Sequence, residues 1–133
     1  MDNETVKKVF SYVFLFSIVF FVLALTFSLT KIYSDVKSVC KEAKEEFQAD
    51  CISSLIAYSK SSNHSDKEKI NAIWALGQLA DSTAIPYLEN LASLYECSKD
   101  GYESYFCYEV KKAIKWCRKG NFTQYMYRQK EEW

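Results

Sequence analysis

The stretch AIWALGQLADSTAIPYLENL, residues 72–91, decides the fold because it holds the chain's only proline and one of its three glycines. Apolar residues recur every three or four positions on both sides of ADST, which is the spacing of one helix face. Asp81 or the serine after it can cap a second helix, and Pro86 falls in that helix's first turn, where proline is tolerated. The stretch predicts two helices, over 67–80 and 83–95, joined by a tight turn.

Gly77 lies inside the first of these helices. A glycine there costs roughly 1 kcal/mol relative to alanine. This cost indicates that another backbone approaches the helix closely at Gly77.

The sequence before this stretch has no glycine or proline from Met1 to Leu76. An apolar stripe with a period of three to four residues predicts one helix over 32–59. That helix should end in the polar run SKSSNHSD, residues 59–66. On such a helix Cys40 and Cys51 lie roughly 16 Å apart and cannot form a disulfide.

About forty residues after the opening stretch, residues 111–128 again have a helix–turn–helix pattern. We predict helices over 103–118 and 122–130. Ala113 aligns with Ile73, Cys117 with Gly77, and Asn121 with Asp81. A repeat of this period, built from helix pairs, is typical of an α-solenoid. The sequence therefore predicts an all-α chain with a small solenoid of about two helix pairs.

The segment over 70–95 resembles a HEAT-like repeat of the short bacterial kind, which is also found in phycobilisome lyases. A fainter second copy covers 105–128. The resemblance implies a fold and not a function, because this repeat serves many unrelated roles. The matching positions are Ala72, Ala75, Leu76, Gly77, Leu79, Asp81, Ala84, Ile85, Pro86 and Leu88.

Near the N-terminus, the run VFSYVFLFSIVFFVLALTFSL, residues 9–29, has no charge, glycine or proline. As a helix it is roughly 30 Å long, the thickness of a bilayer core. A cleavable signal peptide has a shorter apolar run and a small-residue cleavage site, and neither is present. We expect a tail over 1–8, a single transmembrane anchor over 9–30 and a soluble helical domain over 31–133.

The charged residues and the cysteines give opposite indications of the orientation of this anchor. Lys31, Lys37, Lys41 and Lys44 follow the span, whereas only Lys7 and Lys8 precede it, and the positive-inside rule then favours a cytoplasmic C-terminus. Five cysteines in a small domain and two Asn-x-Ser/Thr sequons, at Asn63 and Asn121, favour export. We expect an extracytoplasmic C-terminal domain, either periplasmic or extracellular.

The cysteines allow two interpretations. Cys51 and Cys117 can be small buried hydrophobes on helix faces. Alternatively, Cys97 and Cys107 flank the run SKDGYES, which reverses the chain, and they can form a disulfide across a helical hairpin. Because the cysteine count is odd, at least one thiol is free or pairs with another chain.

The sequence offers no catalytic set, and we predict that the chain is not an enzyme. Its one histidine, His64, lies in a polar loop, and there is no C-x-x-C or glycine-rich phosphate loop. We therefore expect no metal ion and no cofactor. Seventeen basic and seventeen acidic residues balance, which argues against a nucleic-acid partner.

Aromatic residues crowd the C-terminal third of the chain. Of these, we expect Phe106, Trp116 and Phe122 in the core. We expect Tyr102, Tyr105, Tyr125 and Tyr127 at a surface that contacts a partner, since tyrosine is enriched at protein interfaces.

These features predict a membrane-anchored protein-interaction module, a scaffold or accessory subunit that docks a membrane-associated protein. The alternative is a membrane-bound inhibitor of the immunity-protein type, which binds one target tightly.

Overall fold

The computed structural model describes residues 3–97 and 104–133, and this part of the chain is all-helical, as predicted. It divides into two compact units, Met1–Ile32 and Tyr33–Trp133, and the boundary falls inside the first helix. The α-helices are α1 (Asn3–Phe47), α2 (Cys51–Lys60), α3 (Asp66–Leu79), α4 (Ile85–Leu94) and α5 (Tyr105–Lys119), and the 3-10 helices are η1 (Ser82–Ala84), η2 (Gln124–Tyr127) and η3 (Lys130–Glu132).

The first unit consists of the N-terminal part of α1. Its large apolar side chains, from Val6 to Phe27, are exposed within the chain. The most apolar 18-residue window of α1 has a mean hydropathy of 2.5. By length and composition α1 can cross a membrane, and a signal sequence has the same two properties.

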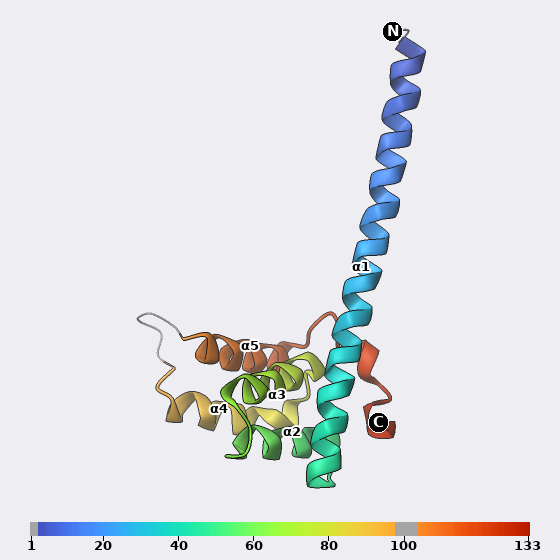
Figure 1. Cartoon of the computed structure of the whole chain (residues 1–133). Coiled ribbons are helices and arrows are strands. Elements are labelled where there is room, and N and C mark those ends of the chain that lie inside the picture. The colour runs from blue at the N-terminus through green and yellow to red at the C-terminus, as the bar shows by residue number, and fades with distance from the viewer. Residues whose placement is uncertain (1–2, 98–103) are drawn as a thin grey trace. The chain divides into compact units, whose positions relative to one another are not determined.

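In the second unit, α3 is the central helix. It packs against α2 on one side and α5 on another, while α4 packs against α5 (Figure 1). Every residue of α3 from Ala72 to Leu79 except Trp74 is buried, because neighbours cover it nearly all round. The core also includes Val36 and Ala43 of α1 and Leu55 of α2.

The close approach that Gly77 indicates is present in the structure. A Cβ at Gly77 would lie 2.9 Å from the Cα of Ala113 and 3.1 Å from its Cβ. The missing side chain therefore lets α3 and α5 pack backbone to backbone at this point.

The predicted helix over 32–59 is wrong, because the chain turns between α1 and α2. Gln48 follows the end of α1 with a left-handed φ of 50°. The side chain of Asp50 then caps α2 by accepting hydrogen bonds from the backbone N–H groups of Ile52 and Ser53. The turn lacks glycine and proline, so the usual sequence signals for a helix end are missing.

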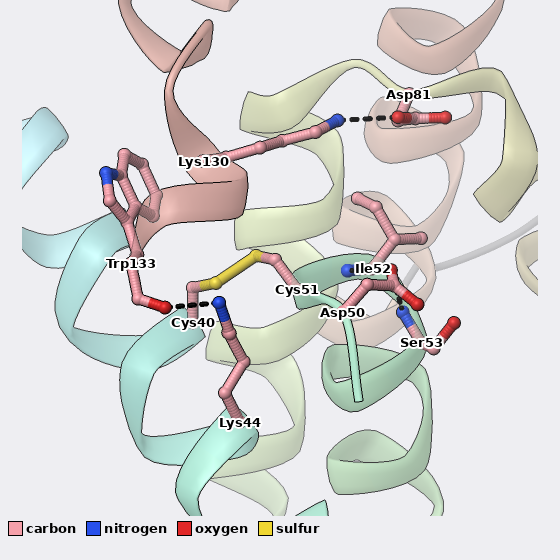
Figure 2. Close-up of a disulfide and its surroundings, with 9 residues drawn as sticks. All are labelled: Cys40, Lys44, Asp50, Cys51, Ile52, Ser53, Asp81, Lys130 and Trp133. Atoms are coloured by element: carbon pink, nitrogen blue, oxygen red, sulfur yellow. Dashed lines mark hydrogen bonds and ion pairs between the residues drawn. A yellow bond between two sulfur atoms is a disulfide. The ribbon is translucent and has the colours of Figure 1, made fainter. Parts of the chain in front are cut away.

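This turn also overturns the expectation that Cys40 and Cys51 cannot bond. The two residues face each other across the break, with Cα atoms 5.4 Å apart, and form a disulfide between α1 and α2 (Figure 2). Next to it, Lys44 of α1 donates a hydrogen bond to the backbone carbonyl of Trp133.

The predicted helix over 122–130 is also wrong, since this segment forms only the short helices η2 and η3. Gly120 ends α5 with a φ of 77°. The side-chain amide of Asn121 then donates to the carbonyls of Gly77 and Gln78 at 2.8 and 2.9 Å. These bonds satisfy carbonyls at the end of α3 and hold the segment across that end.

Candidate binding site

Four helix ends meet at one end of the second unit: the C-termini of α2 and α4 and the N-termini of α3 and α5. They enclose a cavity of about 450 Å³. This volume lies in the range of pockets that hold small ligands or anchoring side chains. We refer to this space as the helix-end cavity.

Apolar side chains make up most of the helix-end cavity. Ile70 and Ile73 come from α3, and Leu91 comes from α4. Tyr95 and Phe106 also line it, and their rings pack with centroids 4.7 Å apart. The cavity can therefore exclude water from an apolar group.

Polar and charged side chains share the wall where α2 ends and α3 begins. Lys60, Asp66 and Lys69 all line the cavity there. The Lys60 Nζ lies 5.0 Å from the ring centroid of Tyr87 in a cation–π contact. The hydroxyls of Tyr87 and Ser59 are hydrogen-bonded at 2.8 Å, and burial raises the pKa of Tyr87. The ring thus stays neutral and holds Lys60 at the cavity.

A second disulfide closes this end of the unit. Cys97 and Cys107 are bonded, with Cα atoms 5.3 Å apart, and Cys107 also lines the cavity. The bond ties the end of α4 to the start of α5. Side chains close to these cysteines in the sequence are largely exposed, and we call them the cysteine-flanking patch: Leu94, Tyr95, Tyr105 and Tyr108.

Of the tyrosines predicted to contact a partner, the three that the structure describes do not form one surface. Tyr105 and Tyr125 are 66% and 65% exposed. Tyr105 is the first residue of the fifteen-residue helix α5, which is about 22 Å long, and Tyr125 lies after its last residue. Tyr102 lies outside the described residues.

For Tyr127 the predicted surface position is wrong, because this residue is only 2% exposed. Its ring stacks on Tyr33 of α1 at 6.0 Å and meets Trp133 edge-on at the same distance. Aromatic pairs in such arrangements bury large apolar areas. Tyr127 is therefore part of the contact between α1 and the C-terminal segment.

The predicted core aromatics also differ from the structure. Phe122 is 81% exposed, so its predicted core position is wrong. Asn121 and Thr123, its neighbours, turn toward α3, and Thr123 donates to the Gln78 side chain at 2.7 Å. Phe122, between them, points outward as a result. Phe106 and Trp116 are half-buried.

Other reactive groups are held in structural contacts. His64 lies 2.8 Å from the carboxylate of Glu46 and stacks on Tyr58 at 3.6 Å. Cys117 is the free cysteine, and burial raises the pKa of its thiol to about 11. A thiol of such high pKa is a poor nucleophile near neutral pH. Across residues 3–97 and 104–133, no three His, Cys, Asp or Glu side chains gather as metal ligands do.

The helix-end cavity and its lysines were not predicted from the sequence. The lining residues run from Ser59 to Cys107 and come from four helix ends, so no spacing along the chain brings them together. The nearest sequence signal is the cysteine pair Cys97–Cys107, which marks one wall.

Comparison of the chain with known protein families, with curated proteins and with solved structures finds no match.

Proposed function

We propose that this chain is a membrane-anchored docking module, in which residues 9–30 cross the bilayer and the helical unit after them binds a membrane-associated protein. The observation that carries the proposal is the cysteine-flanking patch beside the helix-end cavity. Its member Leu94 is 72% exposed although it also lines the cavity. Apolar side chains gathered around a cavity, with tyrosines among them, are typical of protein interfaces.

The anchor is supported by the exposed apolar length of α1. The large apolar side chains from Val6 to Phe27 are exposed within the described chain, and a bilayer supplies the environment that such a helix needs. An anchor confines the helical unit near the membrane, which raises the effective concentration of any partner in the same membrane.

An extracytoplasmic position of the helical unit is supported by its two disulfides, Cys40–Cys51 and Cys97–Cys107. Structural disulfides persist in the periplasm and outside the cell and are rare in the cytosol. The two disulfides outweigh the lysines after the span, because the positive-inside rule is a bias in composition.

We also propose that α3 and α5 are equivalent helices of two HEAT-like repeats. In stacked helix pairs, helices one repeat apart pack side by side. Here α3 packs on α5, and the aligned residues Gly77 and Cys117 lie on the facing sides of these helices. The Cys117 thiol donates to the carbonyl of Leu76 at 3.6 Å.

Cross-linking in living cells tests the docking function. The full-length chain, carrying an affinity tag, is cross-linked with a membrane-permeable reagent, extracted in detergent and analysed by mass spectrometry. We expect one membrane protein to be enriched in a fixed ratio, and Tyr105→Ala combined with Leu94→Ser to lower that enrichment several-fold. Tyr125→Ala is the matched control, because Tyr125 is as exposed as Tyr105 but lies beyond the other end of α5.

Two results would contradict this proposal. A chain that captures no membrane protein has no docking role under those conditions. A single tightly bound soluble target would instead favour the inhibitor function.

A further inference from the structure

We infer that the helix-end cavity receives an aliphatic or aromatic anchor side chain from the partner, and that carboxylates beside this anchor pair with Lys60 and Lys69. The inference rests on the proposed docking function and names its site and the chemistry of its partner.

The apolar lining of the helix-end cavity indicates that the partner's anchor side chain is apolar. Ile70, Ile73 and Leu91 present hydrocarbon to about 450 Å³ of space, which is more than one large side chain occupies. Partner side chains buried in such pockets carry most of the binding energy of many interfaces. A purely polar anchor would lose its hydration here without gaining enough hydrogen bonds.

The charged residues that line the cavity indicate that the partner supplies carboxylates. Lys60 and Lys69 both line the cavity, whereas Asp66 is the only acidic residue among the lining residues. In the described part of the chain no ion pair joins either lysine to a carboxylate, and Lys60 contacts the ring of Tyr87 instead. Two unneutralised cations beside an apolar space complement an acidic segment with an apolar residue.

The side chains around the cavity favour a protein segment, and not a small amphiphile, as its occupant. Leu94 and Tyr95 line the cavity and also extend into the exposed cysteine-flanking patch. A small ligand inside the cavity would leave this patch in water. A peptide chain that crosses the rim would cover it and add the aromatic contacts that interfaces favour.

Peptide display tests this inference without knowledge of the natural partner. The full-length oxidised chain is placed in a lipid nanodisc and used to select from a library of random twelve-residue peptides, with empty nanodiscs for counter-selection. We expect the enriched peptides to share a Leu, Ile, Met or Phe with Asp or Glu on one or both sides. Their affinity should fall as the salt concentration rises, since exposed charges are screened.

Charge reversal then locates the binding site. The double variant Lys60→Glu/Lys69→Glu should weaken the selected peptides by about tenfold, given that each rim ion pair contributes up to about 1 kcal/mol. Lys67→Glu is the matched control, because Lys67 is exposed on α3, the helix of Lys69, but does not line the cavity. It should change the affinity by less than about twofold. Ile70→Trp, which fills the cavity, should weaken binding without removing a charge.

The inference is overturned if the enriched peptides lack acidic residues or if no peptide is enriched. It is also overturned if Lys60→Glu/Lys69→Glu and Lys67→Glu bind the peptides with the same affinity. Saturable binding of decanoate in place of any peptide would also overturn it and assign the cavity to a small amphiphile. A partner captured equally by wild type and by Lys60→Glu/Lys69→Glu would leave the docking function standing and remove only this site.

Discussion

Gly77 shows how one missing side chain fixes the packing of the helical unit. Because Gly77 has no Cβ, α5 approaches so closely that a Cβ there would clash with the backbone of Ala113. All three tryptophans, Trp74, Trp116 and Trp133, lie in the second unit, so their fluorescence reports its unfolding.

The variant Gly77→Ala should lower the free energy of unfolding of the second unit by about 1–2 kcal/mol. Alanine favours the helix by about 1 kcal/mol, but the clash with the Ala113 backbone costs more. Urea titration followed by tryptophan fluorescence of the full-length chain in nanodiscs measures the difference. An increase in stability would show that α3 and α5 do not pack this closely.

The variant Ala80→Gly should have the opposite effect. Ala80 ends α3 in the left-handed region, with a φ of 51°. Glycine adopts this conformation without the penalty of about 1 kcal/mol that a Cβ brings. The same titration should show a gain of a few tenths to about 1 kcal/mol. A loss would mean that the Ala80 side chain contributes more through packing than it costs in backbone strain.

Asp81 links the turn after α3 to the C-terminal segment. Its carboxylate accepts hydrogen bonds from the backbone N–H and the hydroxyl of Thr83. It also accepts one from the Lys130 ammonium at 2.6 Å (Figure 2). Burial alone would raise the pKa of Asp81, but these hydrogen bonds outweigh burial and lower the pKa to about 2. A folded pKa below the unfolded value of 3.8 means that ionised Asp81 stabilises the fold above pH 3.8, and that this stabilisation is lost as the pH falls toward 2.

The variant Asp81→Asn should therefore be less stable than wild type at pH 7, by about 1 kcal/mol. Asparagine keeps the capping ability, so the difference isolates the charge. Urea titrations between pH 2 and 7 should show the two proteins converging below pH 4. A constant difference across this range would exclude the ion pair as its cause. Glu89→Gln, which removes the exposed pair with Arg118, is the control and should have a smaller effect.

For single helices, periodicity and capping residues in the sequence were sufficient to predict part of the structure. Pro86 stands in the first turn of α4, and Asp81 caps the turn before it, because both residues have strong local preferences. The break after Phe47 could not be predicted in the same way. Gln48 takes a left-handed conformation that tertiary contacts and the Cys40–Cys51 bond stabilise, against its own preference.

The candidate site could be predicted from the sequence only where local chemistry marks it. The pair Cys97 and Cys107 was found from its spacing around a reversing segment. The positions of Tyr127 and Phe122 were not, because each depends on where Asn121 and Thr123 find partners on α3. Contacts of this kind, more than forty residues apart, leave no periodic trace in the chain.

Removing the cap of α2 tests the helix break. Asp50→Ala should lower the free energy of unfolding by about 1 kcal/mol, because the backbone N–H groups of Ile52 and Ser53 lose their acceptor. Asp50→Asn should recover most of the loss. Urea titration of both variants measures their free energies of unfolding. If 32–59 were one continuous helix, Asp50→Ala would be neutral or slightly stabilising, since alanine has the higher helix propensity.

The proposed attachment of the chain to a membrane depends on the apolar N-terminal part of α1. The double variant Phe16→Lys/Val19→Lys places two charges in the middle of the span, each at a cost of about 2.5–3.5 kcal/mol. We expect alkaline carbonate to release this variant from membranes, whereas wild type and the flanking variant Lys7→Ala stay in the pellet. Retention of the double variant would show that the chain is held by other contacts.

We propose that a disulfide-closed helical unit lies on the outer side of a membrane, and thiol trapping in intact cells distinguishes this position from a cytosolic one. N-ethylmaleimide is added before lysis, the chain is recovered from carbonate-washed membranes and denatured with the reagent still present, and its mass is measured. We predict one modified cysteine, mapped to Cys117, with Cys40–Cys51 and Cys97–Cys107 intact. Five modified cysteines in the membrane-bound chain would contradict the claim and place the unit in a reducing compartment.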